Sequence, residues 1–401
     1  MLPGGGARRC FSAVTGLPTI AIVFAQFAAY HIDRVEAAAQ HFAGRAHVVG
    51  IEVATGSRAY AWEKSGDLHY AEKRVLFEDA QYEAVSLIRR FGALRRASKD
   101  ADTIFVGLPY SDPAALALMW WGRVWGKRII VMSESKEDDF QRRPSRERMK
   151  RGLLRSAHGA LVGGPRQIAY ARQLGFEARP VLPGYDGVGG ARIRRQAGSP
   201  KIAWQERSFV YVGRFVKKKN LRRLLEAYAL YVRKAGSPSR RLVMVGDGPL
   251  RPELEELAVG LGIVQQVEWA GFLSAAKVSE MVATSLALCL VSTREQWGLV
   301  VNEAAALSIP VIASSPVGAT DLLVEDGRSG FVVGPDDVEG IADAMVKLSR
   351  DHAAWSRFCE RSRQLADRGD VAHFAAGVAV LAGLGTAADE TKLGELLDHR
   401  P

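Results

Sequence analysis

The segment Ser292–Ala304 reads STREQWGLVVNEA and places two carboxylates, Glu295 and Glu303, around a Gly298 that can open a helix. Ionised carboxylates accept hydrogen bonds, so the pair can bind donor groups of a ligand. The alternative is a capping glutamate followed by one on the solvated face of a helix. For two glutamates alone that alternative is the better interpretation, so the surrounding residues have to decide.

The elements around these glutamates predict an anion site. A buried strand, Ala287–Ser292, is expected to run into a turn carrying Glu295, with a helix opening at or just before Gly298. Open α/β sheets bind ligands at the carboxyl ends of their strands. The free backbone N–H groups of Gly298, Leu299 and Val300, together with the helix dipole, would therefore attract an anion there.

A second polar group follows an earlier predicted strand, Ser208–Val212. Gly213 and Arg214 come directly after it, and three lysines at 217–219 lie close behind. An arginine fork contacts phosphate in a bidentate manner, and a lysine adds a mobile point charge. The alternative is a solvated basic turn, and this is our interpretation of Lys217 and Lys218.

Glycine turns follow two further predicted strands. Gly246 and Gly248 lie in Val245–Pro249, where the absence of a side chain lets the backbone approach a ligand. Gly271 and Phe272 lie in a comparable position after the strand Val267–Ala270. Glycines occur in any tight turn, so such a turn alone is weak evidence for a ligand site. The turn with Gly246 and Gly248 is better evidence because it lies between the two charged groups in the sequence.

Over Phe209–Pro335 the order and spacing of these groups resemble those of the retaining glycosyltransferases of family 4, which have the GT-B fold and an E-x7-E motif. The resemblance implies that Glu295 contacts hydroxyls of the donor sugar and that Glu303 accepts hydrogen bonds from the ribose diol. It implies that Arg214 and Lys219 bind the donor's phosphates and stabilise the departing nucleoside diphosphate, so that no metal or other cofactor is required. The backbone near Gly271 and Phe272 would contact the base.

The sequence departs from the family's pattern in two places. The helix after Glu303 reads AAALS over 304–308 where a glycine often precedes the hydrophobic-Pro pair, and Gly318 is followed by alanine instead of a second glycine. Neither departure changes a charged residue that is assigned to donor binding. We therefore expect donor binding to survive.

The N-terminal half resembles the family only in architecture and in fragments. His31 and Arg34 follow the first predicted strand and are candidates for binding the acceptor or a donor phosphate, although a histidine that caps the first helix is an equal alternative. Tyr110 and Asp112 end another strand, where some relatives place a histidine beside the reacting sugar. Glu134, after the strand Arg128–Met132, is a further acceptor-side candidate.

The net charge of +10 is uneven, since residues 1–200 hold 30 Lys and Arg against 19 Asp and Glu. A basic half can bind nucleic acid, an anionic membrane or a small anion. The run Arg142–Arg155 holds seven Lys and Arg, with Glu147 alone acidic, and a partial apolar face that would suit a lipid-linked or membrane-surface acceptor. A solvated helix face is the alternative. No aromatic residues interleave these cations, so we expect no nucleic-acid partner.

Metal sites, disulfides and membrane spans are not expected. The three cysteines, Cys10, Cys289 and Cys359, are far apart, which fits a reducing cytoplasm. The basic run Arg142–Arg155 would add peripheral contact at the inner face of the membrane. Asp100-Ala101-Asp102 resembles a D-x-D metal motif but precedes its strand, whereas a metal site would follow one. The apolar run Leu17–Tyr30 is too short for a bilayer and predicts a buried first strand instead of a signal peptide.

Alternating strand-like and helix-like segments predict an α/β protein with two Rossmann-like, doubly wound parallel sheets facing a cleft. One series of strands is expected at Thr19–Phe24, Ala46–Glu52, Thr103–Leu108, Arg128–Met132 and Gly159–Gly163, and the other at Ser208–Val212, Arg241–Val245, Val267–Ala270, Ala287–Ser292, Val311–Ser314 and Gly330–Val333. Residues 1–195 would bind the acceptor and 205–370 the donor. The Gly- and Arg-rich segment Gly184–Gly198 would be the linker, and a helix in 371–401 would pack back on the first domain.

The predicted function is transfer of a hexose-type sugar from a UDP or GDP sugar to a glycan, a lipid-linked or a small-molecule acceptor. One alternative is a nucleotide-sugar epimerase on the same twin-domain plan, which would need an acid and a base that we do not find in the N-terminal half. The other is a non-catalytic nucleotide-sugar-binding subunit. The presence of Glu295, Glu303, Arg214 and Lys219 together argues against it.

Overall fold

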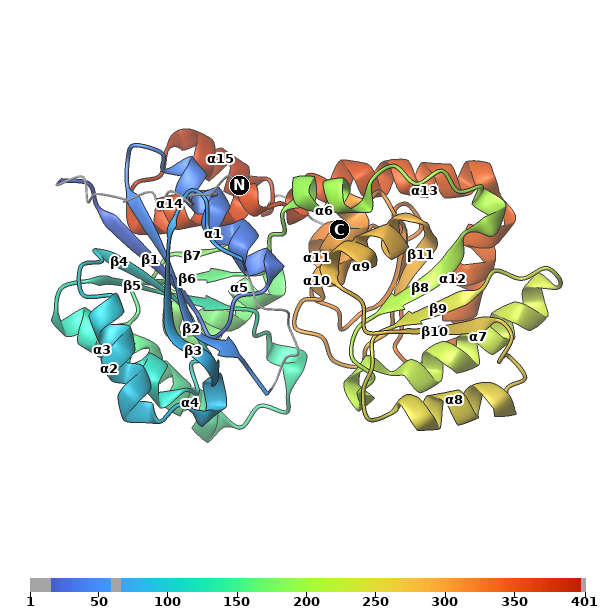
Figure 1. The fold of residues 1–401 in the computed structure, drawn as a ribbon, viewed down its shortest axis with the longest axis horizontal. Coiled ribbons are helices and arrows are strands. Elements are labelled where there is room, and N and C mark those ends of the chain that lie inside the picture. The colour runs from blue at the N-terminus through green and yellow to red at the C-terminus, as the bar shows by residue number, and fades with distance from the viewer. Residues whose placement is uncertain (1–15, 59–65, 398–401) are drawn as a thin grey trace, which may run out of the picture. The chain divides into compact units, whose positions relative to one another are not determined.

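The computed structural model describes residues 16–58 and 66–397, and it divides into two compact units, Met1–Ile130 and Val131–Pro401. Strands alternate with helices through both units (Figure 1). The strands are β1 (Thr19–Phe24), β2 (His47–Gly56), β3 (Glu72–Gln81), β4 (Thr103–Gly107), β5 (Arg128–Ser133), β6 (Gly159–Val162), β7 (Val181–Leu182), β8 (Ser208–Val212), β9 (Leu242–Val245), β10 (Val267–Gly271), β11 (Ser285–Leu290), β12 (Val311–Ser314) and β13 (Gly330–Val333). The α-helices are α1 (Ala29–His41), α2 (Leu87–Ala97), α3 (Pro113–Val124), α4 (Pro144–Leu153), α5 (Pro165–Ala171), α6 (Gly190–Ala197), α7 (Leu221–Ala235), α8 (Arg251–Gly260), α9 (Ala275–Ala283), α10 (Leu299–Ala306), α11 (Thr320–Leu323), α12 (Val338–Arg350), α13 (His352–Leu365), α14 (Val371–Ala382) and α15 (Ala387–Gly394).

The first sheet has the strand order β3-β2-β1-β4-β5-β6-β7. β1 pairs in parallel with β2 and β4, β2 pairs with β3, and β6 pairs with β7. Five of the six residues of β1 are buried, as expected for a parallel strand covered on both faces. The strand order reverses between β1 and β4, so the loops after these two strands lie at the switch point of this sheet.

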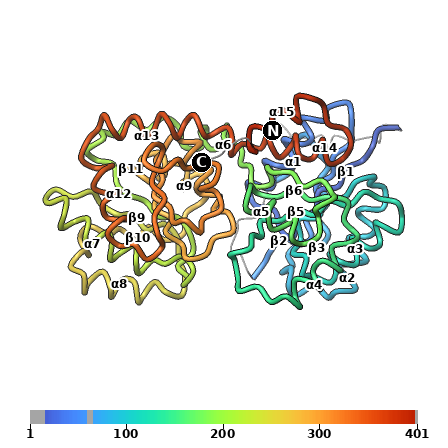
Figure 2. Tube along the Cα trace, turned by 180° about the vertical axis from the view of Figure 1, so that it is seen from behind, coloured from blue at the N-terminus to red at the C-terminus, as the bar shows by residue number. Residues whose placement is uncertain are grey.

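The second sheet has the order β10-β9-β8-β11-β12-β13, and its adjacent strands are parallel. This is the strand order of a Rossmann fold, with its switch point between β8 and β11. Helices cover both faces of the sheet (Figures 1 and 2). α7 packs beside α12 and buries Leu221, Leu224, Leu225, Tyr228 and Tyr231 at helical spacing. The prediction of two Rossmann-like parallel sheets is therefore confirmed.

Three elements differ from the expected series. β3 and β7 were not predicted: β3 is an edge strand with many charged residues, and β7 has two residues. The expected linker Gly184–Gly198 contains the helix α6, which buries Ile193 and Ala197. These two residues are four positions apart and so lie on one face of the helix, which packs against α9 and α10.

The tail helix α14 packs against β6 of the first sheet. Asp370 caps it by accepting a hydrogen bond from the Ala372 N–H, and six of its ten apolar side chains are buried. Gly377 faces Leu161, and a Cβ atom at this position would lie 2.5 Å from Leu161 Cδ1. The boundaries 1–195 and 205–370 given above stay a prediction.

Candidate functional site

The carboxyl end of β8 brings Gly213 and Arg214 to the switch point of the second sheet. Gly213 has φ +153° and donates its N–H to the Val245 carbonyl at 3.0 Å. A Cβ atom here would lie 2.7 Å from the Tyr211 hydroxyl, which itself donates to the Arg214 carbonyl at 3.0 Å. The positive φ and the nearby hydroxyl both favour glycine at position 213. The side chain of the next residue, Arg214, is exposed.

The three lysines form a short 3-10 turn, η6 (Lys217–Lys219), that is tied to the loop after β11. The Thr293 N–H donates to the Lys218 carbonyl at 2.9 Å. Asn220, with a left-handed φ of 59°, donates from Nδ2 to the carbonyls of Val291 and Pro335 at 3.1 and 2.7 Å. Sequence reasoning missed Asn220, although an asparagine between a basic turn and a helix is one of the few residues that adopt this conformation readily.

Lys219 and Glu295 meet at this point. The Lys219 ammonium forms an ion pair with Glu295 Oε2, and the Ser292 hydroxyl donates to the same oxygen at 3.1 Å. Glu295 is only 9% exposed. Burial, and then the nearby Glu295 carboxylate, raise the pKa of the fully buried Tyr211 phenol.

The glycine turns after β8, β9 and β10 pack backbone against backbone. A Cβ atom on Gly246 would lie 2.0 Å from the Gly213 carbonyl oxygen, and one on Gly248 would lie 2.6 Å from the Phe215 carbonyl oxygen. The Gly246 N–H donates to the Gly271 carbonyl at 2.8 Å. These glycines have a packing role, and Phe272, which follows Gly271, is 62% exposed.

α10 begins beside Glu295. Its N-cap Gly298 has φ +101°, and no acidic side chain occupies its first turn. The N–H groups of Leu299 and Val300 in that turn have no carbonyl four residues earlier within the helix, which leaves them available to an anion. Glu303 lies one turn further along α10 and is half-buried.

The buried Asn302 fixes this helix start, and the sequence reasoning did not single it out. Its Oδ1 accepts from the Trp297 indole N–H at 2.8 Å, and its Nδ2 donates to the carbonyls of Asp186 and Gly369 at 2.9 and 3.1 Å. The only signal in the sequence is its place next to Glu303. Its partners are 116 and 67 residues away, so no local pattern reveals them.

The acceptor-side candidates of the first unit have structural partners. His31 Nδ1 accepts from the Ala28 N–H at 3.0 Å, which caps α1, and burial followed by the Arg34 charge lowers the pKa of His31. Arg34 is fully buried, with its guanidinium 4.9 Å from the Tyr30 ring centroid.

The second pair of candidates lies after β4. Asp112 caps α3 through the Ala114 N–H at 2.7 Å and forms an ion pair with Arg90 at 2.9 Å. Both of its oxygens are thus engaged within the unit, and Tyr110 lies half-buried beside it in the turn after β4. Glu134 lies in the other unit, half-buried in the loop after β5.

Neither a metal cluster nor a membrane-spanning helix is present in the part of the chain that the structure describes. No group of three or more His, Cys, Asp or Glu side chains in residues 16–58 and 66–397 is arranged to hold a metal ion. Within the same residues, no helix has the length and apolar character needed to cross a membrane.

Known proteins resemble part of the chain in sequence. Residues 193–366 match the family described as glycosyl transferases group 1. The alpha-D-kanosaminyltransferase of Streptomyces kanamyceticus is 32% identical over 156 residues, which cover 39% of this chain and 40% of that protein. The N-acetyl-alpha-D-glucosaminyl L-malate synthase of Bacillus anthracis is 29% identical over 163 residues, or 41% of each chain. The chain thus spans about two fifths of the length of these relatives.

Solved structures resemble the chain over most of its length. Sucrose-phosphate synthase from Thermosynechococcus elongatus has a TM-score of 0.69 at 20% identity, over 91% of this chain and 98% of that one. HepE from Anabaena, solved in complex with UDP, has a TM-score of 0.69 at 16% identity, over 92% of this chain and 100% of that one. The chain therefore has the GT-B fold, and its residues 193–366 are similar to the group 1 glycosyltransferases.

Proposed function

We propose that the chain is a retaining glycosyltransferase that moves a hexose-type sugar from a nucleoside diphosphate sugar, UDP or GDP, to an acceptor hydroxyl. One observation carries the proposal. At the switch point of the second sheet, Lys219 from the β8 loop and Glu295 from the β11 loop form an ion pair next to the start of α10. A solved structure of the same fold, HepE from Anabaena, contains UDP-glucose, which supports UDP as the nucleotide of the donor.

The positive groups of the site suit a departing diphosphate. In the proposed reaction the bond between the anomeric carbon and the phosphate oxygen breaks, and the electron pair stays with the phosphate. Arg214, Lys219 and the first-turn N–H groups of α10 would stabilise the negative charge that develops there. Removing one such donor from an enzyme costs about 10²- to 10³-fold in rate.

Glu295 would lie beside the sugar from which the diphosphate departs. As the bond breaks, the anomeric carbon gains positive character, and the acceptor oxygen attacks it on the face that the diphosphate leaves. The acceptor's proton passes to the leaving phosphate oxygen, so all atoms and charges balance. Glu303, one turn along α10, would accept hydrogen bonds from the ribose diol.

The alternatives have less support. The matched relatives are named as transferases and synthases, which does not favour an epimerase. An epimerase also needs an acid and a base beside the sugar, whereas His31 and Asp112 cap helices. The acceptor-side candidates stay a prediction: His31, Arg34, Tyr110, Asp112 and Glu134.

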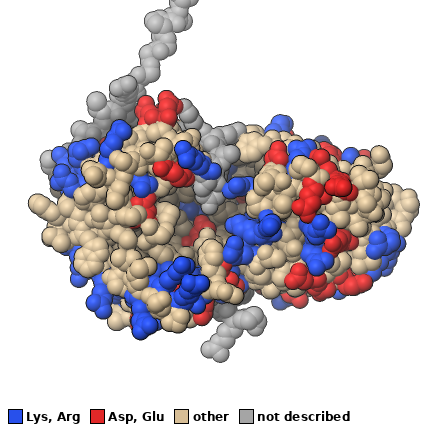
Figure 3. All heavy atoms as spheres, turned by 90° about the horizontal axis from the view of Figure 1, so that it is seen from below, with Lys and Arg blue, Asp and Glu red and all other residues tan. Residues whose placement is uncertain are grey.

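The proposed acceptor is a glycan, a lipid-linked or a small molecule, with peripheral membrane contact through α4 at the cytoplasmic face. On the face drawn in Figure 3, Lys and Arg form several clusters with Asp and Glu between them, so the positive charge is not one continuous field. α4 and its N-cap Arg143 offer a local basic group in which Arg143, Arg146 and Arg148 are exposed. Met149 is exposed beside them, whereas Lys150 is paired with Glu147. Co-sedimentation with anionic vesicles that is lost when these three arginines become alanine would support the contact, and equal binding by this variant would contradict it.

The decisive experiment begins with a thermal-shift panel of UDP, GDP and ADP sugars, because a ligand that binds only the native state raises its melting temperature. The sugar that gives a shift is then incubated with candidate acceptors, and nucleoside diphosphate release is measured. We expect Glu295→Ala to lose transfer and the exposed Glu256→Ala on α8 to retain it. Interconversion of the donor without any acceptor would point to an epimerase, and unchanged transfer by Glu295→Ala would remove Glu295 from the mechanism.

A further inference from the structure

Glu295 lies in a segment, 293–298, that belongs to no helix or strand. Two links hold the segment to the loop after β12: a single parallel bridge between Glu295 and Val317, and a bond from the Ala319 N–H to the Trp297 carbonyl at 3.0 Å. A carboxylate on so short a segment keeps its place only if the backbone on both sides is fixed. Two residues at the start of α5 make the contacts that fix it.

Gln167 holds the residue after Glu295. Its Nε2 donates to the Gln296 carbonyl at 2.9 Å, and its Oε1 accepts from the Gly164 N–H at 3.1 Å. The side chain is fully buried. The Gly164 donor and the Gln296 acceptor fix the orientation of the amide, because swapping its two ends would break both bonds.

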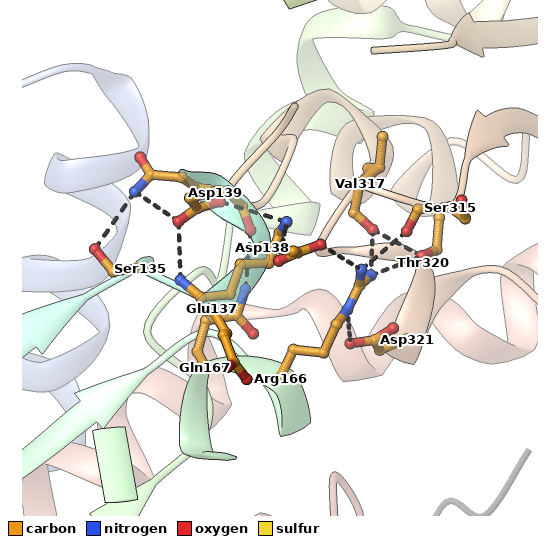
Figure 4. Close-up of polar contacts among 12 residues, drawn as sticks. Ser135, Glu137, Asp138, Asp139, Arg166, Gln167, Ser315, Val317, Thr320 and Asp321 are labelled. Atoms are coloured by element: carbon orange, nitrogen blue, oxygen red, sulfur yellow. Dashed lines mark hydrogen bonds and ion pairs between the residues drawn. The ribbon is translucent and has the colours of Figure 1, made fainter. Parts of the chain in front are cut away.

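Arg166 holds the loop that bridges to Glu295 (Figure 4). Its guanidinium donates to the carbonyls of Ser315 and Val317 at 2.9 and 2.7 Å and to Asp321 Oδ2 at 2.7 Å. Charge-assisted bonds from a planar fork set direction as well as distance. Val317 pairs with Glu295 through the parallel bridge and also accepts a hydrogen bond from Arg166. Arg166 therefore fixes the strand-like partner of the Glu295 backbone.

Gly318 packs tightly against Gln296 and Gln167. A Cβ atom on Gly318 would lie 2.1 Å from the Gln296 carbonyl oxygen and 2.8 Å from Gln167 Nε2, so only glycine fits between them. The Gln296 side chain donates to Asp139 Oδ2 at 3.3 Å, and the fully buried Lys136 pairs with Asp139 Oδ1 at 3.3 Å.

We propose that Arg166 and Gln167 are positioning residues that hold Glu295 in its working place; the inference rests on the role proposed above for Glu295. Neither residue belongs to the motifs of the donor site, and neither contacts Lys219 or Arg214 in the described hydrogen bonds and ion pairs. Their effect therefore falls on the chemical step and spares nucleotide binding. A displacement of about 1 Å at a reacting group costs about 100-fold in rate.

The test compares Gln167→Met with Gln173→Met. Methionine is similar in length and flexibility to glutamine but donates no hydrogen bond, and Gln173 is an exposed glutamine just beyond α5. For Gln167→Met we expect kcat about 10- to 100-fold lower, with donor KM and the UDP-induced thermal shift within about threefold of the unmodified chain. Gln173→Met should match the unmodified chain. Arg166→Lys, which keeps the charge beside Asp321 but loses the fork, should reproduce the fall in kcat.

Hydrogen exchange over 293–298 gives a readout that needs no turnover. Faster exchange there in Gln167→Met than in Gln173→Met supports the proposal, and equal exchange with equal kcat overturns it. A loss of kcat and of the UDP shift together also overturns it, because the residues would then hold the fold as a whole. If the unmodified chain transfers no sugar, the proposed function fails, and the exchange comparison still decides whether Arg166 and Gln167 fix the segment.

Discussion

Among single residues, Lys219 is the sharpest test of the donor site, because it is the one lysine of its turn with a site partner in the described ion pairs. Lys219→Ala removes the cation that faces Glu295 and that would face the phosphates. We expect kcat/KM for the donor to fall about 10²- to 10³-fold, the cost of losing one donor to a developing charge. Steady-state release of nucleoside diphosphate measures it.

Lys217→Ala is the matched control, since Lys217 is exposed in the same turn. It should change the rate by less than about twofold, as expected for a solvated charge. Equal losses in the two variants would mean that the turn attracts the donor only through its general positive charge.

Gly246 tests the backbone packing under the site. Gly246→Ala places a Cβ atom 2.0 Å from the Gly213 carbonyl oxygen, at a φ of +125° that disfavours any side chain. We expect about 2 to 5 kcal/mol lower free energy of unfolding. Gly260→Ala, at the open end of α8 with nothing within 4 Å, should be neutral or slightly stabilising. Urea titration of both variants measures their free energies of unfolding. A loss in Gly246→Ala alone would show that backbone packing causes it, and equal losses would show that any added side chain does.

The sequence reveals residues that act through their own chemistry and hides those that act through distant backbone. Arg214, Lys219 and Glu295 are charged and follow strand ends, so strand order alone brings them to one edge of a sheet. Asn220, Asn302 and Gln167 bond to carbonyls 67 or more residues away, and nothing in their neighbours records this. For His31 the structure shows the capping bond that the sequence offered as its alternative.

At the scale of elements, buried strands can be predicted from the local sequence, whereas exposed strands depend on contacts with distant segments. β1 and β8 are mainly apolar and have the predicted bounds, whereas β4 ends one residue earlier than predicted and β11 lies two residues earlier. β3 is an edge strand whose side chains are half-buried or exposed, and its ordering comes from pairing with β2. α6 is likewise stabilised by packing against α9 and α10, which sequence reading cannot supply.

Asp370 joins two elements and makes a prediction at this scale. Its Oδ1 caps α14 through the Ala372 N–H at 3.0 Å, and its Oδ2 accepts from the Gly190 N–H at the start of α6 at 3.3 Å. Asp370→Ala should lower the free energy of unfolding by about 1 to 2 kcal/mol, the cost of a lost cap. The exposed Asp367→Ala should cost less than about 0.5 kcal/mol. If calorimetry gives equal melting temperatures for both variants, the cap contributes nothing.

For the whole molecule, alternation of strand and helix was enough to predict two doubly wound sheets, because a parallel pair requires a crossover between its strands. The uneven distribution of charge was also visible in the sequence, because the excess of Lys and Arg lies in the first 200 residues. The identity of the sugar and of the acceptor was not visible, because both depend on the side chains that line a bound ligand and not on the elements that carry them.

The response of the whole chain to acid follows from its buried histidines. Burial and then Arg34 lower the pKa of His31, while burial and then Lys392 lower the pKa of His373, which also lies 3.7 Å from Glu395. An unfolded histidine titrates near pH 6.5, so each of these groups binds its proton more readily in the unfolded chain. The free energy of unfolding is therefore complete above about pH 6.5 and falls as the pH drops below it, by up to about 1.4 kcal/mol per pH unit for each histidine. Glu147 and Glu360, whose pKa values are lowered, reduce stability only in more acidic solution.

Urea midpoints should accordingly be lower at pH 5.5 than at pH 7.5, and His373→Gln should shrink the difference because glutamine takes up no proton. His69→Gln is the control, since the His69 side chain is 81% exposed and should leave the difference unchanged. Because His31 and His373 lie in different units, the two transitions should move separately if the units unfold separately, and His373→Gln should then alter only the transition of the second unit. The same pH difference in all three proteins would show that neither buried imidazole governs the response.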